Sequence, residues 1–334
     1  MIRYSLLVLL ALLLFVSGER GSAEEQTPGF HVIKKHTLGG DGGWDYLTLD
    51  SNARRLYIAR SNRVMVMDVD KGSLIGEVKN TPGVHGVAVV PKRDRGFSGN
   101  GGDASVTVFD LKTLQEVNRI KVGQRPDAIL YDPFTSRVFT CNAAGDMTVI
   151  DAETEKVVGT IKLGGKPEAI VSDEKGRVFV NIETKHEVLA IDAKEMTVLH
   201  RWPLAPGEEP TGLAIDTAKR RLFATCHNGK MIVLDAESGK VLDSPTIGKG
   251  TDACSFDPEL GLAYSSNSDG TLTVVHENKE GHYEVLENAT TQAGARTMAL
   301  DMKTHHLFLA TAKAKAGQRR GYEPDSFVIL EVGK

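Results

Sequence analysis

The sequence predicts an all-β protein: a seven-bladed β-propeller of four-stranded antiparallel blades, closed by an N-terminal outer strand on the last blade. Two observations predict this fold. Short apolar runs of strand-forming residues alternate with turns rich in Asp, Asn, Gly and Pro, and no run within the repeat is long enough for a helix. A unit of four such runs then recurs with a period of 40 to 44 residues, which is typical of propeller blades.

The unit is clearest in residues 125–167, where the runs AILY, RVFT, MTVI and VVGTI are separated by turn segments. Its second strand carries an aromatic residue, which recurs at Tyr57, Phe97, Phe139, Phe179, Phe223, Tyr264 and Phe308. Its third strand ends in an acidic or polar residue, which recurs at Asp68, Asp110, Asp151, Asp192, Asp235, His276 and Glu331. Both series have seven members, so we expect seven blades with each aromatic side chain packed between neighbouring blades.

The chain begins with the features of a cleavable signal peptide. Arg3 precedes an apolar run over residues 6–16, and small residues up to Ala23 offer a cleavage site. The run is well short of the roughly 20 residues that a membrane anchor needs, although an uncleaved anchor stays the alternative. We therefore expect residues 1–23 to be a signal peptide and residues 24–334 to form a single propeller domain. The protein would then be periplasmic or extracellular, with no membrane span after cleavage.

Composition and cysteine usage narrow the partners and the means of stabilisation. A hydrophobic content of 41% suits an ordinary globular protein. The formal net charge of -4 lacks the excess of positive charge that is typical of proteins that bind nucleic acid. No linker divides the repeat, and we expect a monomer. Cys141, Cys226 and Cys254 fall on strands of blades three, five and six, so we expect buried free thiols rather than a disulfide framework.

The last blade lacks its own outer strand, because the chain stops soon after the third-strand segment FVILEVGK. Residues 29–40 have the character of a fourth strand and end in TLGG, as the third blade ends in KLGG. We expect the segment from Val32 to Leu38 to complete the last blade. This pairing would close the ring and remove the unpaired edges that an open sheet presents.

Two segments carry a resemblance to a known family. RVFTCN in residues 137–142 and RVFVN in residues 177–181 are each followed by a V-x-V-I-D-like strand and an LGG-x-P-like return. This pattern resembles the YVTN family of β-propeller repeats, and in particular its secreted, YncE-like members. The resemblance covers residues 29–334 and implies the propeller architecture. Because the blade motif is structural, the resemblance does not imply a reaction.

An Asp at the end of the inner strand and an Arg shortly after it recur around the turn between strands one and two. The pairs are Asp50/Arg55, Asp132/Arg137, Asp173/Arg177 and Asp216/Arg221. The carboxylate can accept hydrogen bonds from turn N–H groups, and the guanidinium can pair with the carboxylate. We expect these residues to be structural.

The first residue of each inner strand varies between blades, unlike the rest of the repeat. These positions are Asp45, His85, Asp127, Glu168, Thr211, Asp252 and Arg296. They are expected to ring the mouth of the central channel on one face, the top face. Loops between strands two and three are expected to add Arg60, Asn100, Asn142, Asn181, His227 and Asn267 to this face, and Trp44 could provide a stacking wall.

Several interpretations of this mouth stay open. Polar residues there could simply hydrate the channel or pair with one another, as Arg296 could with Asp45 and Asp252. The mouth could instead hold a small organic molecule, a peptide or a protein. A set of Asp45, His85, Asp127 and Glu168 would also suit a divalent cation with oxygen ligands and one nitrogen, such as calcium, magnesium or manganese.

Two classes of function follow. The first is a binding or scaffold propeller that works through its top face. The second is an enzyme comparable with metal-dependent lactonases or lyases on propeller folds, with a carboxylate or His85 as general base beside a cation. Motifs of zinc proteases, covalent haem attachment, serine hydrolases and P-loops are lacking. Lactonase-type propellers typically have six blades, so seven repeats favour binding.

A long loop from Lys313 to Ser326 replaces the short turn found in other blades. Lys313, Lys315, Arg319 and Arg320 make it basic. We expect it to lie over the acidic mouth as a lid or as a docking site for an anionic group, with a solvated surface loop as the alternative.

Overall fold

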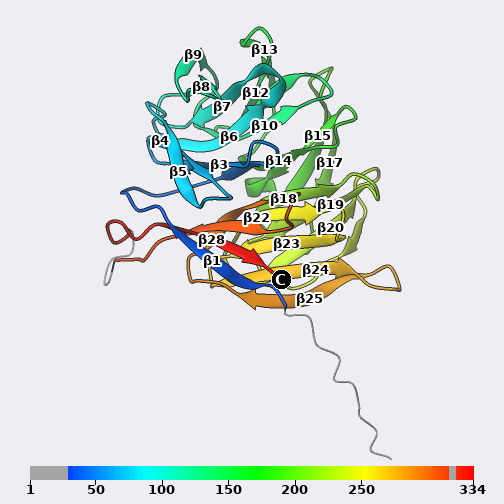
Figure 1. Cartoon of the computed structure of the whole chain (residues 1–334). Coiled ribbons are helices and arrows are strands. Elements are labelled where there is room, and N and C mark those ends of the chain that lie inside the picture. The colour runs from blue at the N-terminus through cyan, green and yellow to red at the C-terminus, as the bar shows by residue number, and fades with distance from the viewer. Residues whose placement is uncertain (1–28, 316–320) are drawn as a thin grey trace, which may run out of the picture.

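The computed structural model describes residues 29–315 and 321–334, which form seven four-stranded antiparallel sheets, the blades of a propeller (Figure 1). The predicted fold is confirmed. The predicted signal peptide, residues 1–23, lies outside the described residues. Within the described part of the chain, no helix combines the length and the apolar composition that crossing a bilayer requires.

Six blades use four consecutive strands each. Blade 1 contains β2 (Leu47–Asp50), β3 (Arg55–Arg60), β4 (Arg63–Asp68) and β5 (Ser73–Val78). Blade 2 contains β6 (Val84–Val90), β7 (Arg95–Asn100), β8 (Ser105–Asp110) and β9 (Glu116–Lys121), with the short 3-10 helix η1 (Pro91–Arg93). Blade 3 contains β10 (Pro126–Asp132), β11 (Arg137–Asn142), β12 (Asp146–Asp151) and β13 (Lys156–Lys162). Blade 4 contains β14 (Pro167–Ser172), β15 (Arg177–Ile182), β16 (Glu187–Asp192) and β17 (Thr197–Pro203), with η2 (Glu183–Lys185).

The remaining blades follow the same order until the ring closes. Blade 5 contains β18 (Pro210–Asp216), β19 (Arg221–Cys226), β20 (Lys230–Asp235) and β21 (Val241–Asp243). Blade 6 contains β22 (Thr251–Asp257), β23 (Leu262–Asn267), β24 (Thr271–Glu277) and β25 (Tyr283–Thr290). Blade 7 contains β26 (Arg296–Leu300), β27 (Leu307–Thr311), β28 (Val328–Gly333) and, from the other end of the chain, β1 (His31–Thr37).

The predicted closure is confirmed, because β1 pairs antiparallel with β28 as the outer strand of blade 7. In Figure 1 the blue β1 lies beside the red β28. A side-chain bond adds to the main-chain ladder: the buried His36 ring contacts Glu331 at 2.8 Å, and Glu331 also contacts His306 at 2.8 Å. The two ends of the described chain are therefore joined in one sheet.

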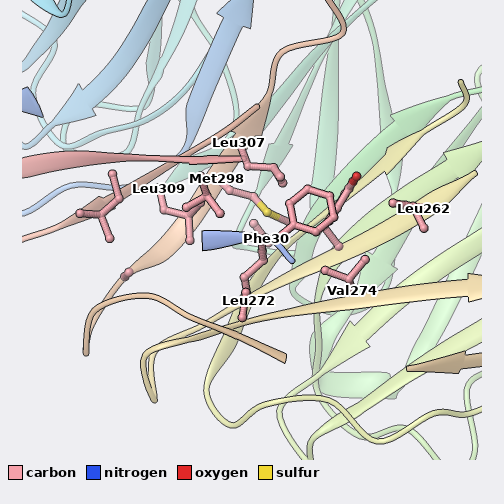
Figure 2. Close-up of a cluster of buried hydrophobic side chains, with 13 residues drawn as sticks. Phe30, Leu262, Leu272, Val274, Met298, Leu307 and Leu309 are labelled. Atoms are coloured by element: carbon pink, nitrogen blue, oxygen red, sulfur yellow. The ribbon is translucent and has the colours of Figure 1, made fainter. Parts of the chain in front are cut away.

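Apolar side chains fill the seams between blades, as the aromatic series predicts. All seven aromatic residues are at most 1% exposed, and each lies in a cluster shared by two neighbouring blades. Figure 2 shows the seam between blades 6 and 7, where Phe30, directly before β1, packs among Leu272, Val274 and Met298. Its ring meets that of Tyr264 edge to face at 5.5 Å between centroids. The N-terminal segment therefore also completes a seam.

The turns between strands one and two are organised by the predicted aspartates. Asp50 accepts hydrogen bonds from two turn N–H groups at 3.0 and 2.9 Å, and Asp216 does the same. The predicted pairing with arginine holds for Asp173 and Arg177, 3.2 Å apart. It is wrong for Arg137, which donates to the Ala193 and Lys194 carbonyls of blade 4. An arginine is long enough to reach the neighbouring blade, so the guanidinium can join two blades instead of closing one turn.

The cysteines are free thiols, as expected. Cys141 and Cys226 are buried and Cys254 is half-buried. Burial raises the pKa of the Cys226 thiol to about 12, so this thiol is not ionised near neutral pH.

Candidate binding site at the channel mouth

A β-bulge recurs near the start of the inner strand in blades 2 to 7. The pairing register shifts across His85, Asp127, Glu168, Thr211 and Asp252 in blades 2 to 6. In blade 7 the shift falls on the residue after Arg296. A bulge interrupts the regular alternation of side chains and re-aims a residue out of the sheet. In blades 2 to 6 the variable residue therefore lies in the bulge, while the strand on either side of it stays paired.

Three of the four predicted metal ligands come together. His85 Nδ1 lies 2.5 Å from Asp45 Oδ2 and 3.7 Å from Asp127 Oδ1. One ligand atom from each of these residues lies within 4.8 Å of the other two. We call Asp45, His85 and Asp127 the mouth triad. A side chain at Gly101 would collide with the imidazole, because its Cβ would lie 2.9 Å from His85 Nε2.

The electrostatics of the mouth triad follow from two carboxylates placed beside one imidazole. The hydrogen bond to Asp45 raises the pKa of His85 to about 8, and the charge of Asp127 adds to this. Burial raises the pKa of Asp127 to about 6, while the nearby imidazolium opposes that change. His85 is therefore largely protonated near neutral pH, and the imidazolium acts as the cation between the carboxylates.

Glu168, the fourth predicted ligand, belongs to a separate group. Its carboxylate contacts Lys166 Nζ at 2.8 Å, and Lys166 also binds Glu183 from η2. Burial raises the pKa of Glu168 to about 8, helped by repulsion from Asp127. Burial alone would lower the pKa of Lys166, but its two carboxylate partners outweigh burial and raise it. Lys166 was not predicted from the sequence, because it precedes the inner strand in a turn.

The remaining mouth positions divide into one ion pair and one buried hydroxyl. Arg296 donates to Asp252 at 2.6 Å, as the sequence allowed, and burial raises the pKa of Asp252. Thr211 is 2% exposed and donates to the Thr251 carbonyl at 3.1 Å. Thr211 therefore joins two blades and is not open to a ligand.

Tyr46, the residue after Asp45, connects blade 1 with blade 4. Its hydroxyl donates to the main-chain carbonyl of Glu168 at 3.2 Å, so a side chain of blade 1 reaches blade 4. Burial and the surrounding carboxylates raise its pKa well above the usual value. Tyr46 and residues of the inner strands line a cavity of about 300 Å³. Sequence reasoning missed Tyr46, although the blades 2 to 6 carry Gly or Ala at this position: Gly86, Ala128, Ala169, Gly212 and Ala253.

The asparagines predicted in the loops between strands two and three are not open to a ligand. Asn100, Asn142 and Asn181 are fully buried at or near the ends of second strands. Asn100 and Asn142 bond hydroxyl groups of the third strand, and Asn181 donates to the Gly212 carbonyl of blade 5. The NH₂ groups of these amides are therefore bonded within the protein, whereas Oδ1 of Asn142 and of Asn181 has no partner among the described residues.

The other residues predicted to line the top face lie in different surroundings. Arg60 and Asn267 are also fully buried. His227 is the exposed member and lies 3.3 Å from Glu209. Trp44 is 8% exposed and packs on Tyr322 and Phe327, so it belongs to the seam between blades 7 and 1 and is no stacking wall.

The basic loop of blade 7 is described only at its base. Ala314 and Tyr322 form an isolated bridge, and Lys315 N donates to the Gly321 carbonyl at 3.1 Å. Arg319 and Arg320 lie outside the described residues. The base of the loop lies beside the glycine-rich segment 39–43, with which it encloses a pocket. Whether the loop lies over the mouth stays a prediction.

Comparison with solved structures agrees with this architecture. Hydrazine synthase of Kuenenia stuttgartiensis matches with a TM-score of 0.74 at 16% identity, covering 88% of this chain and 97% of that chain. U3-55K matches with a TM-score of 0.74 at 10% identity, covering 90% and 98%. The WD40 repeats of RRP9 match equally well at 10% identity, covering 91% and 97%. Identities this low show the fold alone.

Sequence comparison gives a more specific result. None of the curated proteins compared with the chain matches it significantly. The chain does match one family profile, described as outer membrane protein assembly factor BamB, over residues 60–293. Because this match covers well over half of the sequence, the chain belongs to the family of outer membrane protein assembly factor BamB.

Proposed function

We propose that the protein is a binding propeller of the cell envelope or extracellular space that holds a divalent cation at the mouth triad. The observation that carries this proposal is the convergence of two carboxylates and one imidazole from three neighbouring blades, with ligand atoms within 4.8 Å of one another. Two carboxylates with a neutral imidazole carry two negative charges, which matches a divalent ion. A carboxylate and imidazole set suits manganese well, with calcium and magnesium as the other candidates.

The surroundings support cation binding in a confined site. The His85 side chain is partly exposed, so an ion at the mouth triad would keep open positions toward solvent. A small molecule or a protein could supply ligands there. The top face would then act as a scaffold whose partner binds through, or beside, the ion.

Location is the second part of the proposal. The matched family is that of an outer membrane protein assembly factor, and residues 1–23 carry the pattern of a signal peptide. Both favour a periplasmic or extracellular protein. The finer likeness to secreted, YncE-like YVTN propellers points in the same direction.

Calorimetric titration with Mn²⁺ at pH 8.5 tests the cation site. The wild-type protein should bind one ion, and His85→Ala or Asp127→Asn should weaken binding by at least about tenfold, because each removes one ligand. Asp252→Asn is the matched control, since it removes a mouth carboxylate outside the mouth triad and should change the affinity far less. Equal binding by all four proteins, or no saturable binding of Mn²⁺, Ca²⁺ or Mg²⁺ by the wild type, would refute the site.

A second candidate function is an enzyme at the same mouth, comparable with metal-dependent lactonases or lyases. The observation that favours it is the burial of Glu168 near the mouth triad, which together with repulsion from Asp127 raises the pKa of its carboxyl although Lys166 lies 2.8 Å away. Such a group can serve as a general acid. Hydrolysis of a lactone panel with Mn²⁺ present, lost in Glu168→Gln while Mn²⁺ still binds, would support catalysis. Binding of Mn²⁺ without turnover of any lactone would leave the binding function.

A further inference from the structure

Asp45 is held in the mouth triad differently from its two partners. His85 and Asp127 lie within β6 and β10, each at the β-bulge of its strand. Asp45 instead lies before the first residue of β2, Leu47. The regular ladder of blade 1 begins after Asp45, so further contacts must fix this residue.

Contacts from three blades hold the main chain at Asp45. Its N–H donates to the Ala59 carbonyl of blade 1 at 3.2 Å. The next N–H along the chain, that of Tyr46, donates to the His85 carbonyl of blade 2 at 3.0 Å. The Asp45 carbonyl accepts a hydrogen bond from the hydroxyl of Thr297 in blade 7 at 3.0 Å. Both main-chain polar groups of Asp45 are therefore bonded, one of them by a side chain of the last blade.

Blade 7 makes a second contact beside this one. The Trp44 indole N–H donates to the Arg296 carbonyl at 3.3 Å. Two consecutive residues of blade 7, Arg296 and Thr297, therefore bind two consecutive residues of blade 1, Trp44 and Asp45. The position of Asp45 depends on the seam between the last and the first blade as well as on its own blade.

The backbone of Thr297 is strained. Its φ angle is 57°, in the left-handed region, which a β-branched residue rarely adopts. Among the non-glycine residues with positive φ in residues 29–315 and 321–334, Thr297 is the only β-branched one and the only one inside a strand. It is skipped in the pairing of blade 7 and is 1% exposed. Glycine would adopt this angle without strain, so the strain points to a function of the threonine side chain.

Thr211 provides a comparison within the same ring. Its hydroxyl also crosses to the next blade, where it donates to the Thr251 carbonyl at 3.1 Å, and it is 2% exposed. Thr211 has no positive φ angle, and the carbonyl that it binds does not belong to the mouth triad. A hydroxyl bond between two blades therefore does not by itself require the strained backbone of Thr297.

We propose that Thr297 is a positioning residue of the mouth triad: its hydroxyl holds the Asp45 main chain so that the carboxylate meets the His85 ring. The consequence for cation binding rests on the function proposed above, whereas the contact between Asp45 and His85 exists without an ion. Blade 7, which supplies no ligand to the mouth triad, then influences its affinity.

Thr297→Val tests the proposal, because it keeps the shape of the side chain and removes the hydroxyl. Calorimetric titration with Mn²⁺ at pH 8.5 should show binding weakened by roughly three- to tenfold, whereas Thr297→Ser, which keeps the hydroxyl, should stay within about twofold of the wild type. Thr297→Gly also removes the hydroxyl and relieves the strain, so it replaces the valine variant if that variant does not fold, and it should bind Mn²⁺ as weakly. Thr211→Val is the matched control, since it removes a buried hydroxyl between blades and should lower the melting temperature while leaving the affinity for Mn²⁺ unchanged.

A measurement without metal separates this proposal from the cation site. The NMR signals of the His85 ring report its contact with Asp45, and they should change in Thr297→Val but not in Thr211→Val. That result, together with no binding of Mn²⁺ by the wild type, would refute the cation site and support the positioning role. Unchanged ring signals and unchanged affinity for Mn²⁺ in Thr297→Val and Thr297→Gly would overturn the positioning role.

Discussion

His85 lies between two carboxylates of neighbouring blades, and this position controls its charge. The hydrogen bond to Asp45 contributes most to the raised pKa of His85, and the charge of the more distant Asp127 adds to it. Because the ring is 38% exposed, water can exchange protons with it and an ion can reach it. The same two neighbours that stabilise an imidazolium would stabilise a metal ion in its place.

The pKa of His85 can be measured directly. We expect a value of about 8 in metal-free wild-type protein and a value nearer the usual 6.5 in Asp45→Asn, because that variant loses the hydrogen bond that raises it. Titration of the imidazole signals by two-dimensional NMR gives both values. Identical titration curves in the two proteins would show that Asp45 does not hold the proton of His85.

The raised pKa also has a consequence for stability. A group whose pKa is higher in the folded state contributes its full stabilisation below the unfolded value, here 6.5, and loses it as the pH rises through about 8. The difference in free energy of unfolding between wild type and His85→Gln should therefore shrink between pH 6.5 and 8. Urea denaturation at several pH values measures it, and a constant difference would contradict the assignment.

Sequence spacing was sufficient to find Asp45, His85 and Asp127, because the repeat fixes which strand end each residue occupies. It was not sufficient for Asn100 or Trp44. Asn100 is polar and Trp44 lies next to Asp45, so both were expected on the top face. Asn100 instead bonds the third strand of its own blade, and Trp44 packs in the seam between blades 7 and 1. Tyr46 could have been identified from the sequence, because it is a large side chain at a position where blades 2 to 6 have Gly or Ala.

At the scale of elements, the inner strand combines two opposite requirements. In blade 3 its end carries Asp132, which holds the following turn, and near its start the pairing register shifts across Asp127. The regular part could be predicted from the repeat. The bulges could not, because they depend on which main-chain groups pair across the sheet.

A variant of Asp132 tests whether the aspartate at the end of the inner strand stabilises the fold. It is fully buried and accepts hydrogen bonds from Thr135 N at 2.9 Å, Thr135 Oγ1 at 2.6 Å and Ser172 Oγ of blade 4 at 2.6 Å. Asp132→Ala leaves these donors unpaired, so we expect a loss of about 2 to 3 kcal/mol in the free energy of unfolding. Urea denaturation measures the loss.

Asp151 of the same blade provides the control. It organises an exposed turn through Thr154 and bonds no residue of another blade within the described chain. Asp151→Ala should therefore cost less, about 1 kcal/mol. Equal losses in the two variants would argue against a special role for the contact between blades.

At the scale of the whole molecule, the propeller depends on one sheet built from both ends of the chain. Without β1, blade 7 would expose the edge of β28, and the seam in Figure 2 would lose Phe30. The sequence predicted this closure because a fourth-strand pattern was missing at one end and present at the other. It could not predict the contact between His36 and Glu331, which requires the register of the two strands.

Deleting residues 24–40 tests ring closure. The truncated protein should melt at a lower temperature and aggregate, since it exposes a strand edge and apolar surface. Deleting only residues 24–28 is the matched control, because it keeps Phe30 and the whole of β1, and it should change neither property. Differential scanning calorimetry and light scattering measure both effects. A monomeric 24–40 deletion with unchanged melting temperature would contradict the closure.

Anomalous diffraction from crystals grown with Mn²⁺ shows whether the mouth triad binds a divalent cation. The predicted result is one strong anomalous peak within roughly 2.6 Å of Asp45, His85 and Asp127, and its loss in His85→Ala crystals. A map with no peak at these three residues, from crystals soaked in Mn²⁺ at pH 8.5, would show that the mouth triad does not bind the ion.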